Sequence, residues 1–132
     1  MTLLQIMTAL IVIETGGHPD PNNAIGNNGK AWGVLQMHEA YVADAAQYAN
    51  VSWTHADALD PSKAKEIFVA YMSPYAQKKN KPYGMTYAEY VSRKHNGGPT
   101  GHLKESTISY WLKVKEALQL IYPTLQQNPQ KQ

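Results

Sequence analysis

The chain has 132 residues, a length that suits one compact domain. Of these residues, 43% are hydrophobic and 17% are charged, a composition that supports a buried core and argues against wholesale disorder. The net charge of +2 is too small a bias for a nucleic-acid binder, which carries a clustered basic face. The absence of cysteine excludes a disulfide scaffold, a cysteine-ligated zinc site and a cysteine nucleophile.

The first predicted element is a helix over Leu3–Glu14, which Gly16 and Gly17 end. This segment is apolar nearly all round, a pattern typical of a helix that is buried on every side. It is too short to span a membrane, and no Lys or Arg precedes it as one would in a signal peptide. We therefore expect a structural helix, with no stable membrane insertion and no export signal of its own.

A polar segment follows, in which Gly, Asn, Pro and Asp dominate from His18 to Gly33. This composition predicts a long loop, with a small β-hairpin that turns at Asn28-Gly29. The spacing of apolar residues then predicts a helix over Leu35–Ala49. One face of that helix carries Met37, Tyr41, Ala45 and Tyr48.

Asp60 and Pro61 are typical of a helix start, with Asp60 as the N-cap and Pro61 at the first position. The helix that they open has an apolar stripe at helical spacing, which predicts the face that it buries. The residues of this stripe are Ala64, Ile67, Phe68, Tyr71, Met72 and Tyr75.

Two more helices are predicted in the last third of the chain. Thr86 with Glu89 resembles a capping box, which predicts a short helix that runs to about Lys94. A second Gly-rich loop, His95–Pro99, separates it from a last helix over about Ser106–Ile121. The inward residues of this last helix are expected to be Ile108, Trp111, Leu112, Leu118 and Ile121.

The sequence therefore predicts an all-α fold of about five helices with at most a small β-hairpin. Residues 1–125 form the predicted domain, and the polar segment 126–132 is expected to be a flexible tail. Two long Gly-rich loops interrupt the helices. Long loops without secondary structure in a small domain are usually functional, so we expect the site there.

Glu14 is the first candidate for catalysis, because it lies between an apolar helix and a polar Gly-rich loop. A carboxyl held in apolar surroundings can stay protonated near neutral pH and act as a general acid. The alternative interpretation is a solvated residue that merely ends the helix.

The two loops supply candidates for ligand binding. Gly26, Gly29 and Gly33 let the backbone approach a ligand closely, and Trp32 among them offers a flat surface for a sugar ring. Asn96 in the second loop offers both a donor and an acceptor to a polar ligand. The alternatives are a core position for Trp32 and an ordinary turn position for Asn96.

Three motifs in order, Glu14–Gly17, Gly29–Gln36 and His95–Pro99, resemble the signature of soluble lytic transglycosylases and goose-type lysozymes. The match extends from about Leu3 to Leu118. Near its end, Thr107, Tyr110-Trp111 and Val114 resemble the family's closing T-x-x-Y-x-x-V pattern, with one more residue between Tyr110 and Val114 than the pattern has. The resemblance implies a lysozyme-like fold for residues 1–125. It also implies cleavage of the β-1,4 bond between N-acetylmuramic acid and N-acetylglucosamine, without a metal or an organic cofactor.

The resemblance implies a role for individual residues. Glu14 matches the catalytic acid, which protonates the glycosidic oxygen, and Gln36 matches the glutamine that lines the sugar groove. His95 departs from the pattern, since the family usually has Tyr there, and Tyr110 is an alternative source of a hydroxyl. The full set expected to contact substrate is Thr15, Trp32, Gln36, His95, Asn96 and Tyr110.

The resemblance leaves the outcome of the reaction open. Inverting hydrolysis needs a second carboxylate roughly 6.5–9.5 Å from the acid, to activate water. The positions that carry it in goose-type lysozymes are Asn27 and His38 here, so Asp20 and Asp44 are the nearest acidic substitutes. A lytic transglycosylase needs only one Glu, because the C6 hydroxyl of muramic acid attacks and leaves a 1,6-anhydro end. The missing carboxylate therefore favours the transglycosylase reaction.

The expected partner is the glycan strand of peptidoglycan, with the chain acting as a monomer on the bacterial cell wall, in the periplasm or outside the cell. The size and the start of the chain suggest a phage endolysin or a virion-associated lysin. A periplasmic enzyme without its leader is the alternative. A chitinase of the same fold and a non-catalytic glycan-binding module are the rival functions.

Overall fold

The computed structural model describes residues 1–125, and these fall into two compact units. The first unit contains Met1–Ile13 and the described chain from Tyr75 onward, and the second contains Glu14–Pro74. The described part holds five α-helices, several short 3-10 helices and one two-stranded antiparallel sheet, which confirms the predicted mainly helical fold. The predicted tail, 126–132, lies outside the described residues.

Helix α1 (Leu3–Thr15) forms as predicted, but it is not buried on every side. Ile6 and Leu10 are fully buried, whereas Leu4 is 59% and Val12 is 47% exposed. The prediction of burial all round is therefore wrong. Residues three and four positions apart share one face of a helix, and only one such stripe of α1 is covered.

The predicted hairpin is confirmed in the second unit. Strands β1 (Ile25–Gly26) and β2 (Ala31–Trp32) pair antiparallel, with Ile25 opposite Trp32. The turn between the strands contains three consecutive residues in the left-handed region, Asn27, Asn28 and Gly29. Asn and Gly tolerate this region better than other residues, which is why the turn forms here.

Helix α2 (Glu39–Ala49) begins four residues later than the predicted start at Leu35. Gln36 has a φ of +49°, and the backbone of Met37 exchanges two hydrogen bonds with that of Trp32, of 2.9 and 3.0 Å. This tight turn cannot be helical, so the apolar residues at its start belong to the hairpin region.

Helix α3 (Pro61–Tyr75) follows two 3-10 helices, η1 (Pro21–Asn23) and η2 (His55–Leu59). Asp60 caps α3 as predicted, because its Oδ1 accepts hydrogen bonds from the first backbone amides of the helix. The predicted stripe forms the core of the second unit, except that Tyr75 is only half-buried. Its buried members are Ala64, Ile67, Phe68, Tyr71 and Met72.

Helix α4 (Tyr87–Gly97) belongs to the first unit and follows η3 (Lys78–Asn80). Thr86 caps it by accepting a hydrogen bond from the backbone N–H of Glu89. The helix continues past the predicted end at Lys94 and stops only at Gly98, whose φ is +88°. The prediction that His95 and Asn96 lie in a loop is therefore wrong, since both lie in the last turn of α4.

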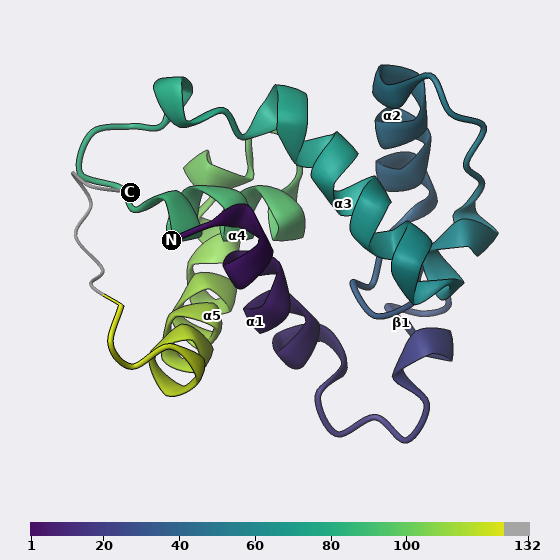
Figure 1. The fold of residues 1–132 in the computed structure, drawn as a ribbon, viewed down its shortest axis with the longest axis horizontal. Coiled ribbons are helices and arrows are strands. Elements are labelled where there is room, and N and C mark those ends of the chain that lie inside the picture. The colour runs from purple at the N-terminus through teal and green to yellow at the C-terminus, as the bar shows by residue number, and fades with distance from the viewer. Residues whose placement is uncertain (126–132) are drawn as a thin grey trace. The chain divides into compact units, whose positions relative to one another are not determined.

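Helix α5 (Ile108–Ile121) is reached through η4 (Gly101–Leu103) and η5 (Glu105–Thr107), and α4 packs against α5 and η4 (Figure 1). Two of the residues predicted to face inward on α5, Trp111 and Leu118, are buried. The prediction is wrong for the other three, because the buried face of α5 does not include them. They are Ile108, Leu112 and Ile121, which are 41%, 56% and 37% exposed.

No helix in residues 1–125 is long and apolar enough to cross a membrane.

Candidate functional site

Glu14 lies in the last turn of α1, next to the point where the helix ends. Its side chain is half-buried, and the neighbouring Thr15 is buried with 7% exposure. The chain then turns away at Gly17, whose φ is +85°. A Cβ at Gly17 would meet nothing within 4 Å, so the backbone just beyond the carboxyl is open.

Two of the three glycines in the hairpin region, Gly26 and Gly33, lie close to other parts of the second unit. Gly33 has a φ of +83°, and a Cβ there would lie 1.8 Å from the carbonyl oxygen of Ala58. A Cβ at Gly26 would lie 2.4 Å from Oε1 of Gln36. Gly29 alone of the three has nothing within 4 Å, so it is the one position that leaves space beside the hairpin.

The side chain of Gln36 is half-buried and holds the loop together. Its Nε2 donates hydrogen bonds of 3.0 Å to two backbone carbonyl oxygens, those of Ala24 and Gly33. Both donor hydrogens of the amide are therefore used within the second unit. A contact between Gln36 and a sugar stays a prediction.

Trp32 is neither in the core nor fully exposed, because it forms part of the wall of a pocket. Its Nε1 donates a hydrogen bond of 2.7 Å to the carbonyl oxygen of Gly29. Its ring stacks on the imidazole of His55, with the ring centres 3.7 Å apart and the planes 6° from parallel. The Nε2 of His55 lies 2.8 Å from the carbonyl oxygen of Met37, so this nitrogen is the protonated one.

The pocket has a volume of about 720 Å³ and is lined entirely by residues of the second unit. The side chains that give it chemical character are Lys30, Trp32, His38, Glu39, Thr54 and His55. Sequence reasoning found Trp32 but missed His55, which is 23 positions away and carries no local signal for the stack.

The two positions expected to carry a base in goose-type lysozymes are in contact with each other. Nδ2 of Asn27 lies 3.0 Å from Nε2 of His38. Of the acidic substitutes, Asp20 is exposed and its Oδ2 accepts a hydrogen bond from Nδ2 of Asn23, whereas Asp44 is half-buried on α2. Neither Asp20 nor Asp44 lines the pocket of Trp32.

The end of α4 contains three buried polar residues in succession, Arg93, Lys94 and His95, followed by the exposed Asn96. The Nζ of Lys94 donates to the carbonyl oxygen of Tyr75 and lies 4.3 Å from the centre of the Tyr90 ring. Removing a charged side chain from water is costly, so buried cations such as Arg93 and Lys94 need hydrogen-bond or ring partners.

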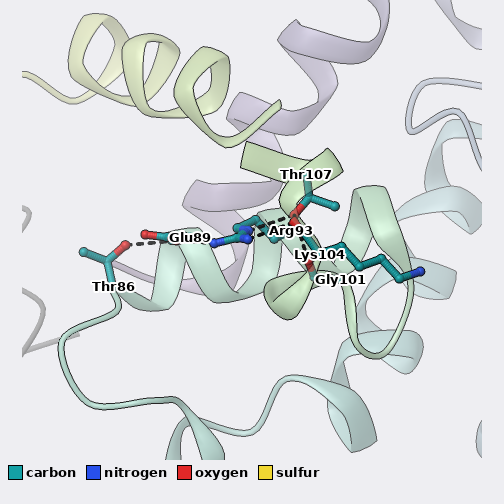
Figure 2. A network of polar contacts seen from close by, with 6 residues as sticks. All are labelled: Thr86, Glu89, Arg93, Gly101, Lys104 and Thr107. Carbon is teal, nitrogen blue, oxygen red and sulfur yellow. Dashed lines mark hydrogen bonds and ion pairs between the residues drawn. The ribbon is translucent and has the colours of Figure 1, made fainter. Parts of the chain in front are cut away.

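Arg93 is the centre of a network of polar contacts (Figure 2). Its guanidinium donates to Oγ1 of Thr107 at 2.8 Å, to a carboxylate oxygen of Glu89 at 2.7 Å and to the carbonyl oxygen of Lys104 at 2.9 Å. The pair with Glu89 spans one turn of α4, so the spacing of these two residues in the sequence was a usable signal.

The same network fixes the segment between α4 and α5. The hydroxyl of Thr107 lies 2.7 Å from the carbonyl oxygen of Gly101 and 2.8 Å from that of Lys104. The Nζ of Lys104 donates to the carbonyl oxygen of Gly97 at 2.6 Å. A Cβ at Gly101 would lie 1.9 Å from the carbonyl oxygen of Arg93, so the segment packs directly on the backbone of α4.

The predicted site residues divide between the two units. Those in the second unit are Glu14, Thr15, Trp32 and Gln36, and those in the first are His95, Asn96 and Tyr110. Of the latter, His95 and Tyr110 are buried. Within residues 1–125, no group of three or more His, Asp or Glu side chains is placed to hold a metal ion.

Comparison with known proteins gives relatives among the lysozymes, although no protein-family model matches the chain. A lysozyme of Ostrea edulis is 37% identical over 84 residues, which are 63% of this chain and 57% of that protein. The chain thus spans less than two thirds of the length of this relative.

Solved structures match over more of the chain. The lysozyme of Meretrix lusoria, in a complex with PliI of Aeromonas hydrophila, superposes with a TM-score of 0.65 and 27% identity. The lysozyme of Tapes japonica gives a TM-score of 0.65 and 24% identity. Each match covers 85% of this chain and 87% of the other. These relatives are invertebrate (i-type) lysozymes, and the chain has a lysozyme-like fold.

Proposed function

We propose that this chain cleaves peptidoglycan at the β-1,4 bond between N-acetylmuramic acid and N-acetylglucosamine. The observation that carries the proposal is the likeness to lysozymes along 85% of the chain, together with the position of Glu14. Glu14 is half-buried at the end of a helix with open backbone beyond it. In this position the carboxyl acts as the general acid that protonates the glycosidic oxygen.

The reaction that we favour is that of a lytic transglycosylase, in which Glu14 serves first as acid and then as base. The support for this choice is the pair Asn27 and His38. By the resemblance, these are the positions at which a hydrolase of the goose type has acidic residues, and their side chains lie 3.0 Å apart. No carboxylate then holds the attacking water, and the C6 hydroxyl of muramic acid is the nucleophile instead.

Hydrolysis is the second candidate, because the relatives are named lysozymes. It requires a base, and the acidic residues proposed for this role are Asp20 and Asp44. Thr15, His95, Asn96 and Tyr110 are proposed to line the substrate site in either reaction, and Asn96 offers its amide to the acetamido group.

The test is mass spectrometry of the fragments that the wild type and Glu14→Gln release from purified peptidoglycan. We expect fragments one water lighter than hydrolysis products, and no fragments from Glu14→Gln. Glu66→Gln is the matched control, since Glu66 is an exposed carboxylate of α3, and it should behave as the wild type.

Each other result has a definite meaning. Reducing ends in place of anhydro ends would favour hydrolysis, and Asp20→Asn and Asp44→Asn would then identify the base. Undiminished cleavage by Glu14→Gln would refute Glu14 as the acid. Cleavage of chitin oligomers without cleavage of peptidoglycan would favour a chitinase, and binding without any turnover would favour a glycan-binding module.

A further inference from the structure

The charges of the chain are divided unevenly between its two units. The first unit, Met1–Ile13 and Tyr75–Gln132, has nine Lys and Arg residues in its sequence but only three acidic residues. The second unit, Glu14–Pro74, has three Lys and seven acidic residues. The net charge of +2 therefore combines a basic first unit with an acidic second unit. Charge of one sign gathered in one part of a chain favours a partner of the opposite sign.

Basic residues of the first unit are concentrated in the segment between α3 and α4. Residues 77–85 contain Lys78, Lys79 and Lys81, and we call this segment the lysine loop. Lys78 and Lys79 are exposed, and Tyr83 in the same segment is 90% exposed. The lysine loop thus presents cations and one aromatic ring at the surface.

No carboxylate neutralises the two exposed lysines of this loop. The sequence has no acidic residue from position 67 to position 88, and the next one, Glu89, is already paired with Arg93 at 2.7 Å. Within residues 1–125, neither Lys78 nor Lys79 makes an ion pair. Their charge is therefore available to an anion from outside the chain.

The lysine loop is ordered by contacts of its own. The hydroxyl of Tyr87 donates a hydrogen bond of 2.9 Å to the carbonyl oxygen of Ala76, which joins the two ends of the loop. The Nζ of Lys81 donates to the carbonyl oxygen of Met85 at 2.5 Å, and the Nζ of Lys78 lies 4.9 Å from the centre of the Tyr87 ring. Compact surface loops with joined ends are frequently functional, and an ordered loop loses little entropy when it binds.

The size and composition of the lysine loop favour a flexible polyanion over other anionic partners. Binding to a membrane surface generally uses about four to eight basic residues or a broad apolar face, and the loop has neither. Single-stranded nucleic acid is held by several aromatic rings along a basic groove, whereas Tyr83 is the one exposed ring of this loop. The ammonium group of lysine is a compact point charge that suits a phosphate group.

We propose that the lysine loop binds a linear polyol phosphate of the bacterial cell wall. Lys78 and Lys79 pair with its phosphates, and the ring of Tyr83 packs against the polyol. The choice of a cell-wall polymer rests on the proposed function, whereas the preference for a polyanion rests on the loop and on the charge of the first unit. None of the residues proposed for glycan cleavage takes part.

The probe for the test is fluorescently labelled poly(glycerol phosphate), titrated with the protein over a series of salt concentrations and followed by anisotropy. We expect saturable binding whose logarithm falls linearly with the logarithm of the salt concentration. In Lys78→Gln/Lys79→Gln the slope should be smaller by about 1.4, since each phosphate contact of a single strand contributes about 0.7. The affinity at low salt should fall about fivefold, as expected for the loss of two exposed ion pairs.

Lys113→Gln/Lys115→Gln is the matched control, because both are exposed lysines of α5 in the same unit and the double variant has the same net charge. It should keep the slope of the wild type. Tyr83→Ser should weaken binding without changing the slope, since the phenol carries no charge at neutral pH.

Several results would overturn the proposal. They are absence of binding to the wild type, equal losses in the two double variants, and tighter binding to poly(glutamate), to a single-stranded oligonucleotide or to vesicles of anionic lipid than to poly(glycerol phosphate).

Failure of the proposed function gives a different result. Glu14→Gln should bind the probe as the wild type does, because Glu14 is not part of the lysine loop. Binding of the probe by a wild type that leaves peptidoglycan uncut would reject the proposed function and retain the loop. Cleavage of peptidoglycan without binding of the probe would retain the function and reject the loop.

Discussion

Thr107→Val removes one oxygen from the network around Arg93 and leaves the shape of the side chain nearly unchanged. Thr107 is 1% exposed. Its hydroxyl accepts a hydrogen bond of 2.8 Å from Nε of Arg93 and lies within 2.8 Å of the carbonyl oxygens of Gly101 and Lys104. A hydroxyl has one hydrogen, so it donates to one of these carbonyls at a time.

The cost follows from the groups that lose a partner. A hydrogen bond from a charged donor contributes about 1.5–3 kcal/mol, and the lost donation to a carbonyl adds about 1 kcal/mol. We therefore expect Thr107→Val to lower the free energy of unfolding by about 2.5–4 kcal/mol. Thr107→Ser keeps the hydroxyl and removes only a buried methyl group, which should cost about 1 kcal/mol.

Urea denaturation of the wild type and both variants measures the difference. The midpoint should fall in the order wild type, Thr107→Ser, Thr107→Val, with an unchanged slope m. If Thr107→Val were as stable as Thr107→Ser, the hydroxyl would contribute no more than the buried methyl group, and the reasoning about the network would be refuted.

Three further predictions concern other parts of the fold. Gly33→Ala should lower the free energy of unfolding, measured by urea denaturation, by more than about 3 kcal/mol, because its Cβ would collide with the backbone of Ala58. Gly29→Ala is the control: its φ is similar but a Cβ there meets nothing within 4 Å, so it should cost only about 1–2 kcal/mol. Burial and two nearby cations lower the pKa of His102, so the fold favours its neutral form. The stability that this provides is fully present above pH 6.5 and is lost as the pH falls. In thermal melting measured against pH, His102→Gln should therefore reduce the dependence of the melting temperature on pH in this range. A hydrogen bond from the backbone amide of Thr54 lowers the pKa of Asp57, so the carboxylate stabilises the fold above pH 3.8, and this stabilisation is lost on further acidification. Asp57→Asn should therefore lose less stability than the wild type between neutral and acid pH in urea denaturation.

The helical core could be predicted from the sequence because its signal is local. The stripe of α3 repeats every three or four residues, and all but one of its members are buried as expected. The same reasoning failed for α1, where Leu4 and Val12 are apolar but exposed. An apolar run predicts that a helix is partly buried, but it does not tell which neighbours exist to cover each side.

The candidate site was less predictable, because its contacts join distant parts of the chain. Trp32 could be singled out, but the imidazole that stacks on it comes from His55. The sequence predicts a loop at Asn96, because His95–Pro99 is rich in Gly and ends in Pro. The backbone nevertheless stays helical up to Gly98. Arg93 carried only the signal of its pair with Glu89, and its partners beyond Gly98 depend on the fold.

The left-handed backbone conformation of Asn27 limits which residues can occupy this position of the turn. Its φ of +49° excludes most side chains, but Asp tolerates this region nearly as well as Asn. Asn27→Asp would thus put a carboxylate beside His38 with no strain in the turn, and a carboxylate oxygen would replace the amide that now lies 3.0 Å from Nε2 of His38. The backbone of the turn therefore accepts an amide or an acid at this position, and one substitution would place a carboxylate in the hairpin without rebuilding it.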